Sequence, residues 1–267
     1  MQSIKELKNL RGRRSIITGA YGSLGKVITQ TLAELGSDLI LVDKPDSINR
    51  TFEKVITDNW GIDIISIECD LEKEEDRVRL FQNIADKRLQ INSLINNAAF
   101  VGDSDMKGWS APFEDQSLKA WRRAIEVNLT AAFHLSQLFA PALRENSGGN
   151  ILNISSIYGE YAPDWSLYEG TNMGNPAAYS ASKGGLIQLT RWLATTLAPE
   201  VRVNSIAPGG IHRNQTKQFV EKYEKKTPMK RMASEDDLRG AVAFLSSDMS
   251  NYVTGQTIFV DGGWGIW

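Results

Sequence analysis

The stretch TGAYGSLG at residues 18–25 decides the fold that we predict for this chain. It follows the apolar run SIIT and leads into KVITQTLAEL, whose apolar residues recur with helical spacing. A glycine-rich turn between a strand and a helix lets the backbone approach a pyrophosphate, while free N–H groups of the helix face the negative charge. An ordinary tight turn is the alternative. The position between a strand and a helix favours a dinucleotide site.

Short apolar or β-branched runs recur along the rest of the chain and alternate with stretches of helical spacing. The runs are continuous rather than alternating, which is typical of parallel strands covered on both faces. We therefore predict a doubly wound α/β sheet. The expected strands are 15–18, 39–42, 62–67, 93–95, 150–154, 201–206 and 257–260. The expected helices are 24–35, 47–60, 74–89, 118–146, 177–198, 216–225 and 235–246.

The length and composition favour one large globular domain. The chain has 267 residues, of which 42% are hydrophobic and 23% are charged, and single α/β domains often reach roughly 200–250 residues. We predict one domain over residues 1–267, with the cofactor half at about 1–150 and the catalytic and substrate half at about 151–267. Two long connections, 100–116 and 158–176, are expected to select the substrate, because long loops tend to be functional.

Charge and cysteine content exclude several kinds of partner. Lysine and arginine number 30 against 32 acidic residues, a net charge of −2, so no basic field attracts nucleic acid or anionic membranes. The single cysteine, Cys69, rules out an intrachain disulfide and is typical of a reducing compartment. No segment approaches the roughly 20 apolar residues of a membrane helix, and the N-terminus lacks the plan of a secretory signal. We expect a soluble cytoplasmic protein.

Two aspartates follow the second and third expected strands. Asp43 ends LVD, where a carboxylate can accept hydrogen bonds from ribose hydroxyls and repel a 2′-phosphate, so NAD is favoured over NADP. Lys44 and Arg50 are near enough in sequence to soften that discrimination. Asp70 is a candidate to bind the adenine amino group, or else to cap the helix that begins near Glu72.

The sharpest chemical signal is YSASK, residues 179–183. Helical spacing places Tyr179 and Lys183 on one face, so that an ammonium near the phenol is expected to stabilise its phenolate and lower its pKa. Such a tyrosine can act as a general acid/base near neutral pH. The fifth strand ends in ILNISS, which brings Ser155 and Ser156 to the same edge of the sheet, and the alternation of a strand points only one of them into the site.

These motifs together resemble the short-chain dehydrogenase/reductase family. TGAYGSLG, NNAA, VNLT, ILNISS, YSASK, VNSIAPGGI and VDGG occur in the family's order over essentially the whole chain. The resemblance implies a Rossmann-like seven-stranded parallel sheet of order 3-2-1-4-5-6-7, a nicotinamide cofactor and hydride transfer to or from a small substrate. The segment after Ser156 further resembles a branch that accompanies bacterial flagellin and surface-glycan modification, which implies a sugar or sugar derivative as substrate.

The resemblance also implies roles for individual residues. Tyr179 is the acid/base, Lys183 its electrostatic partner, Ser156 orients the substrate and Asn128 positions a proton-relay water, although a buried and satisfied amide is the alternative for Asn128. The implied cofactor contacts are Gly19, Tyr21, Ser23, Leu24, Gly25, Asp43, Asp70, Leu71, Asn97, Ala98, Tyr179, Lys183, Pro208, Gly209 and Ile211.

This chain departs from the family pattern at three places. Ser23 stands where the middle turn glycine is usual, and Ala99 replaces the glycine of the NNAG element. Arg213 aligns with the usual threonine after PGGI, which indicates either an anionic substrate group or a role in oligomer packing. The long 158–176 connection contains aromatic and acidic residues that can stack on and hydrogen-bond to a polyol, or else pack against the protein itself: Trp165, Tyr168 and Glu169.

Other reaction classes lack their residues. His134 and His212 are the only histidines, and no H-E-x-x-H or Cys/His cluster occurs, so no metal site is expected. The alternative to an enzyme is a dinucleotide-binding sensor or assembly protein on the same scaffold. The presence of the complete catalytic set favours the enzyme: Asn128, Ser156, Tyr179 and Lys183.

A homo-oligomer is also expected. Trp264 and Trp267 lie near a terminus that a monomer is expected to leave exposed. The family resemblance implies tetramers or dimers built through long helices, here 118–146 and 177–198.

Overall fold

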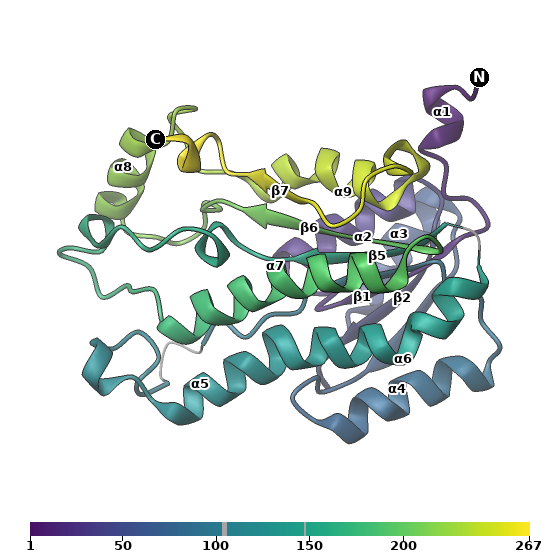
Figure 1. The fold of residues 1–267 in the computed structure, drawn as a ribbon, viewed down its shortest axis with the longest axis horizontal. Helices are drawn as coiled ribbons and strands as arrows, with labels where there is room; N and C mark the ends of the chain where they lie inside the picture. Colours follow the sequence, from purple (N-terminus) through teal and green to yellow (C-terminus); the bar gives the residue numbers. More distant parts are fainter. Residues whose placement is uncertain (103–105, 147) are drawn as a thin grey trace.

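Each of the seven apolar runs forms a strand in the computed structural model, which describes residues 1–102, 106–146 and 148–267. All neighbouring strands are parallel, and their order is β3-β2-β1-β4-β5-β6-β7 (Figure 1). The predicted fold class and strand order are confirmed. The strands are β1 (Arg14–Thr18), β2 (Asp38–Asp43), β3 (Ile64–Glu68), β4 (Ser93–Asn96), β5 (Gly149–Ile154), β6 (Val201–Pro208) and β7 (Thr257–Val260).

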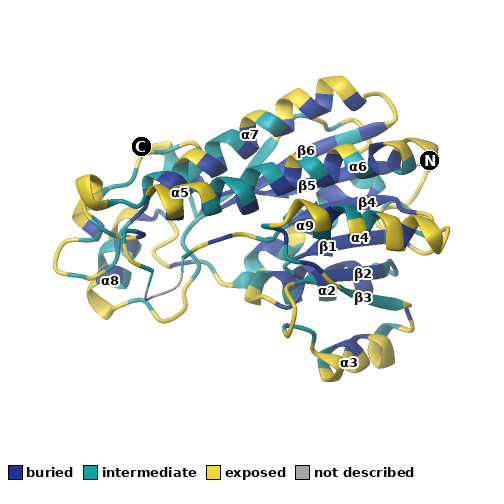
Figure 2. Ribbon diagram, turned by 90° about the horizontal axis from the view of Figure 1, so that it is seen from below, coloured by how far each residue is buried: buried dark blue, intermediate teal, exposed yellow. Residues whose placement is uncertain are grey.

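Helices cover both faces of the sheet (Figure 2). Successive strand residues face opposite ways, so Ile16 packs with α4, α6 and α7, whereas Ile17 packs with α2, α3 and α9. Burial on both faces explains why the strands read as continuous apolar runs. The helices are α1 (Ile4–Leu7), α2 (Ser23–Glu34), α3 (Arg50–Trp60), α4 (Glu74–Asp86), α5 (Leu118–Ile125), α6 (Ala131–Glu145), α7 (Ala177–Leu197), α8 (Lys217–Lys226) and α9 (Arg239–Ser246).

The expected helix 118–146 is interrupted. A π-helical turn, Glu126–Thr130, separates α5 from α6, and the Ala131 N–H bonds to the Glu126 carbonyl five residues back. Asn128 lies in this turn, and its amide bonds to groups on two other segments. A single π turn inside a helix is a frequent feature of functional sites. Helical periodicity alone does not reveal such an insertion.

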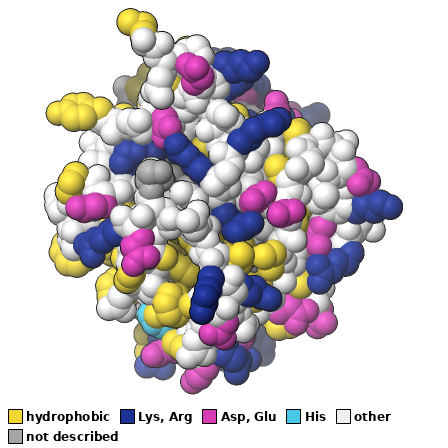
Figure 3. Space-filling model, turned by 90° about the vertical axis from the view of Figure 1, so that its right-hand side faces the viewer, with side chains coloured by type: hydrophobic (Ala, Val, Ile, Leu, Met, Phe, Trp, Pro, Cys, Tyr) yellow, Lys and Arg dark blue, Asp and Glu magenta, His cyan; other side chains and the backbone are white. Residues whose placement is uncertain are grey.

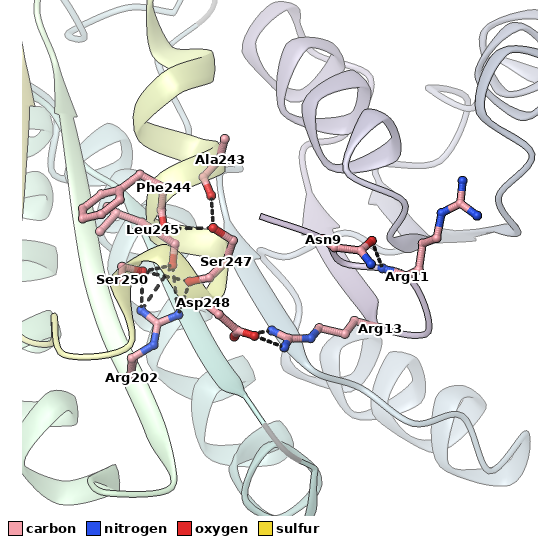
Figure 4. A network of polar contacts seen from close by, with 10 residues as sticks. All are labelled: Asn9, Arg11, Arg13, Arg202, Ala243, Phe244, Leu245, Ser247, Asp248 and Ser250. Atoms are coloured by element: carbon pink, nitrogen blue, oxygen red, sulfur yellow. Dashed lines mark hydrogen bonds and ion pairs between the residues drawn. The ribbon is translucent and has the colours of Figure 1, made fainter. Parts of the chain in front are cut away.

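Ion pairs and hydrogen bonds join the N-terminal segment to the C-terminal part of the chain (Figure 4). The Arg13 guanidinium donates to both carboxylate oxygens of Asp248, at 2.8 and 2.5 Å. Arg202 lies beside this pair and donates to the Leu245 carbonyl at 3.2 Å and to the Ser250 hydroxyl at 2.9 Å. The residue before β1, a residue of β6 and the turn after α9 therefore hold one edge of the molecule together.

The face on the right-hand side of Figure 1 carries lysines and arginines interspersed with acidic residues (Figure 3). Mixed signs of this kind produce no large single-sign field. Among the described residues, no helix is both long and apolar enough to cross a bilayer.

The C-terminal tryptophans differ from each other. Trp264 is buried and stacks on Tyr223, with ring centroids 4.4 Å apart and an interplanar angle of 13°. The expectation that a monomer leaves Trp264 exposed is therefore wrong, because Tyr223 of α8 covers it within the same chain. Trp267 remains largely exposed.

Candidate active site

A cleft of about 710 Å³ opens along the carboxyl ends of the strands. Its size is within the range of small-molecule and cofactor sites, and its position is the usual one for ligands of open α/β sheets. All of the sequence-predicted site residues line the cleft except Asn128. They are Gly19, Tyr21, Ser23, Leu24, Gly25, Asp43, Asp70, Leu71, Asn97, Ala98, Ser156, Tyr179, Lys183, Pro208, Gly209 and Ile211.

The glycine turn at one end of the cleft is built for close backbone approach. Gly19 has a φ of +64°, which an L side chain rarely adopts. A Cβ added to Gly25 would overlap the Gly19 carbonyl oxygen, so α2 packs directly on the turn. Gly22 is the N-cap residue of α2, and no side chain caps the helix, which leaves its first N–H groups for an anion. These residues fit the pyrophosphate of a dinucleotide.

Asn97 ties the end of β4 to the turn. Its amide donates to the carbonyls of Thr18 and Gly19, at 2.9 and 3.1 Å. The Thr18 hydroxyl accepts in return from the N–H groups of Asn97 and Ala98, at 3.0 and 3.1 Å. Sequence reasoning missed the role of Thr18, although this residue is the first of the TGAYGSLG motif. These four hydrogen bonds fix the carboxyl end of β1 against the carboxyl end of β4.

Asp43 lies in the cleft with a fixed carboxylate. One oxygen accepts from the Tyr21 N–H at 2.9 Å, and the other accepts from the N–H of the next residue, Lys44, at 2.8 Å. The Tyr21 phenol itself donates to Glu53 at 2.6 Å, and burial raises its pKa. Tyr21 thus presents its backbone to Asp43 while its hydroxyl anchors the turn on α3.

Asp70 makes local contacts at the end of β3. One carboxylate oxygen accepts from the Glu72 N–H at 3.2 Å, and the other lies 3.5 Å from the Lys73 ammonium. Lys73, not Asp70, is the N-cap residue of α4. Asp70 therefore shapes the loop beside the cleft rather than capping the helix.

Tyr179 and Lys183 lie one turn apart at the start of α7, as the spacing predicted. The Lys183 side chain is 2% exposed, and its ammonium donates to the Ile154 carbonyl at 2.7 Å. Burial lowers the pKa of Lys183 to about 8. Its Nζ lies 5.9 Å from the centroid of the Tyr179 ring.

The two serines after β5 face different ways. The Ser155 hydroxyl donates to the Lys183 carbonyl at 2.9 Å and so fastens β5 to α7. The Ser156 hydroxyl accepts from the Tyr158 N–H at 3.2 Å. It also interacts with the phenol of Tyr179 and favours the ionised form of that phenol, which opposes the rise in its pKa. Of the two, Ser156 is therefore the one placed beside the phenol.

The pKa of Tyr179 is raised, not lowered. Burial is the main cause, and the Ser156 hydroxyl and the Arg213 charge oppose it. The expectation of a net lowering of this pKa is wrong for this structure, because burial of the phenol, which helical spacing does not reveal, outweighs the groups that favour its ionised form. A raised pKa keeps the phenol protonated at neutral pH.

Asn128 does not line the cleft and is fully engaged by the protein. Its Oδ1 accepts from the Phe100 N–H at 2.6 Å, while its Nδ2 donates to the Phe100 carbonyl at 3.2 Å and to the Ser182 hydroxyl at 3.0 Å. Ser182 in turn donates to the Tyr179 carbonyl at 2.8 Å. Asn128 thus connects the π turn to the cleft wall at Phe100 and to the first turn of α7.

The two long connections behave differently. Phe100 and Val101 line the cleft, and residues 103–105 of the same connection lie outside the described residues. In the 158–176 connection, the Tyr158 and Tyr168 hydroxyls are 2.7 Å apart and the Tyr168 ring packs on Phe219 of α8. Trp165, Tyr168 and Glu169 are absent from the cleft lining. For Tyr168, packing against the chain itself is therefore the interpretation that holds.

The chain is similar to a known protein family and to a protein of named function. A family model described as enoyl-(acyl carrier protein) reductase matches residues 19–265. Post-translational flagellin modification protein A of Campylobacter coli is 31% identical over 259 residues, which cover 96% of this chain and 100% of that protein.

Two solved structures are also similar. A short-chain dehydrogenase from Leptospira borgpetersenii with bound NAD⁺ has a TM-score of 0.83 and 30% identity, covering 99% of this chain and 96% of the other. A gluconate 5-dehydrogenase from Burkholderia cenocepacia in complex with NADP and tartrate has a TM-score of 0.87 and 26% identity, covering 99% and 100%. The match extends through the glycine turn, β5 and α7. The chain belongs to the short-chain dehydrogenase/reductase family and is an NAD(P)-dependent oxidoreductase.

Proposed function

We propose that this enzyme transfers a hydride between NAD(H) and the carbonyl or secondary alcohol of a small polar substrate, a sugar or sugar derivative. The observation that carries the proposal is the meeting of Ser156, Tyr179 and Lys183 in the cleft that also contains the uncapped glycine turn. Similarity to a flagellin modification protein and to a gluconate dehydrogenase supports the substrate class.

The side chains divide the proton chemistry between them. The nicotinamide supplies or accepts the hydride when bound. Tyr179, protonated at neutral pH because burial raises its pKa, donates its proton to the carbonyl oxygen during reduction. Ser156 orients that oxygen, and the buried ammonium of Lys183 favours negative charge on the phenol oxygen once its proton has left.

The test is turnover. Purified protein is mixed with NADH and keto-sugars, nucleotide-activated sugars or small ketones, and in the reverse direction with NAD⁺ and polyols, while the nicotinamide absorbance is followed. We expect turnover on at least one carbonyl or alcohol class. NADH binding without turnover on any class would favour the sensor or assembly function instead.

We further propose NAD(H) as the cofactor in preference to NADP(H). The Tyr21 and Lys44 N–H groups hold the carboxylate of Asp43 in the cleft. This carboxylate supports the choice of NAD(H), because it can accept hydrogen bonds from ribose hydroxyls and repels a 2′-phosphate. Lys44 also lines the cleft. Its backbone N–H donates to the Asp43 carboxylate and so helps to hold that carboxylate in place.

Replacement of Asp43 is expected to relax cofactor selection. In Asp43→Ser, the ratio of kcat/KM for NADH to that for NADPH should fall by about tenfold to a hundredfold, or roughly 1.4–2.7 kcal/mol, because the repelling charge is gone. Steady-state kinetics with both cofactors measure this ratio. Asp58→Ser, at an exposed position on α3, is the matched control. A wild-type enzyme that prefers NADPH would contradict the proposal.

We propose a homo-oligomer that forms through α5, α6 and α7. Large apolar side chains are exposed on these helices, which supports an interface there: Leu118, Trp121, Phe133 and Trp192. Most soluble oligomers are symmetric assemblies of this kind.

Charges introduced on these helices should break the assembly. We expect light scattering at micromolar concentration to give a dimer or tetramer for the wild type and a smaller mass for the double variant Trp121→Glu, Phe133→Glu. Ile4→Glu, at an exposed site on α1, should keep the wild-type mass. A monomeric wild type would refute the interface.

We also propose that residues 1–267 act as one cofactor-binding and catalytic domain in the cytoplasm. The single sheet from β3 to β7 supports the first part. The one buried, unpaired cysteine, Cys69, supports the second, because free thiols suit a reducing compartment.

A further inference from the structure

Arg213 lies on the segment that follows β6 at the catalytic end of the cleft. The backbone of this segment is held on both sides. Ile211 bridges to Ala233, the Arg213 N–H donates to the Gln215 Oε1 at 2.6 Å, and the Gln215 amide donates to the Ile211 carbonyl at 2.8 Å. The base of the arginine is thereby fixed beside the cleft.

The guanidinium is only partly used by the protein. Its Nε donates to Glu235 at 3.1 Å, and the side chain is about half exposed. Among the described residues, Glu235 is the hydrogen-bond partner of the Arg213 guanidinium, and it contacts the Nε alone. The two terminal nitrogens therefore remain as a planar pair of donors, which is the geometry that binds carboxylate and phosphate oxygens bidentately.

Charge is distributed unevenly along the cleft. Among the described lining residues, the carboxylates are Asp43 and Asp70, both at the β2 and β3 end, where the cation Lys44 also lines the cleft. The catalytic end is lined instead by the cations Lys183 and Arg213. Lys183 is buried and committed to the Ile154 carbonyl, so Arg213 is the cation there that can meet a ligand. Its charge also reaches the phenol of Tyr179.

We propose that Arg213 binds an oxyanionic group of the substrate, a carboxylate or a phosphate, while Tyr179 faces the reacting carbonyl. The inference rests on the proposed oxidoreductase function and narrows its substrate to anionic keto or hydroxy compounds. The pyrophosphate of the dinucleotide is the competing anion. The uncapped N-terminus of α2 already supplies N–H groups for that pyrophosphate.

The kinetic test compares three probes of equal carbon length: a keto-hexose, the same keto-hexose carrying a phosphate, and a keto-hexonate. We expect the wild type to prefer one anionic probe, which identifies the group as phosphate or carboxylate. In Arg213→Met, the ratio of kcat/KM for that probe to kcat/KM for the neutral keto-hexose should fall about tenfold to a hundredfold, chiefly through KM. Arg213→Lys should recover only part of this ratio, because it keeps the charge without the planar fork.

Glu235→Gln is the matched control, because it removes the partner and keeps the arginine. It should maintain or increase the preference for the anionic probe. Equal losses on neutral and anionic probes in Arg213→Met would overturn the proposal. A rise in the Kd for NADH, measured by fluorescence titration, would assign Arg213 to the cofactor and overturn it as well.

A binding measurement separates this inference from the proposed function. Calorimetric titration of each probe into the protein saturated with NAD⁺ needs no turnover. Binding of an anionic probe that Arg213→Met abolishes supports the anion site even where no probe is turned over, in which case only the proposed reaction fails. If no anionic probe binds more tightly than the neutral keto-hexose, the proposal is wrong.

Discussion

Tyr179→Phe is expected to reduce kcat by about a hundredfold to ten-thousandfold, the range that a positioned general acid/base contributes. The substitution removes one hydroxyl from the first turn of α7 and leaves the ring in place. The Tyr179 ring, Lys183 and the glycine turn all remain in place, so the Kd for NADH should change little. Steady-state kinetics and fluorescence titration of NADH measure the two quantities on the same preparation.

Tyr252→Phe is the matched control for the loss of a phenol hydroxyl. Tyr252 is fully exposed on the surface and should keep wild-type kcat. A Tyr179→Phe enzyme with wild-type kcat would remove the phenol from the mechanism. An unchanged cellular function of this variant, together with retained NADH binding, would favour the sensor or assembly alternative.

Gly25→Ala is expected to abolish measurable binding of NADH. Its Cβ would overlap the Gly19 carbonyl oxygen and lie 2.8 Å from the Ala20 carbonyl carbon, and both neighbours are backbone atoms that cannot rotate away. The helix must then move off the turn, which displaces the N–H groups that face the pyrophosphate. We expect affinity to fall at least about a hundredfold and Tm to fall by about 5–10 °C, the size expected of an overpacked site in a chain of this length.

Gly22→Ala is the control within the same turn. Gly22 has a φ of −67°, and an added Cβ would lie 3.4 Å from the Gly19 carbonyl oxygen, an ordinary van der Waals contact. This variant should lose far less affinity and stability than Gly25→Ala. Circular dichroism checks that both variants are folded, and calorimetry measures NADH binding. Equal affinities for the two variants would show that close packing of α2 on the turn does not control the site.

The sequence predicted the edge of the sheet at which the chemistry lies. TGAYGSLG and ILNISS each lie at the end of an apolar run, and parallel strands bring their carboxyl ends to one edge. YSASK lies at the start of α7, the α-helix that follows β5 in the chain. Gly25, Ser156 and Tyr179 therefore meet in one cleft despite their distance along the chain. Hydrophobic periodicity and strand direction, which are local properties of the chain, indicate this edge.

The ionisation and contacts of the proposed catalytic groups could not be predicted in the same way. The pKa of Tyr179 is raised because neighbouring segments exclude water from its phenol, and desolvation depends on the packed structure. The partners of Asn128 could not be predicted either: the Phe100 backbone and the Ser182 hydroxyl bond to its side-chain amide. Its partners come from two other segments, and no spacing within 118–146 indicates them.

The sequence by itself determined the doubly wound sheet, the glycine turn and the Tyr179–Lys183 pair, because hydrophobic periodicity and i,i+4 spacing act between residues that are near in the chain. Only the tertiary structure decided which charges face the reacting group. It buried the ammonium of Lys183 against Ile154, covered Trp264 with Tyr223, and placed Arg213 in the cleft lining with its Nε bonded to Glu235. The physical reason is that burial and electrostatic neighbours are set by contacts between distant segments, which form only when the chain is folded.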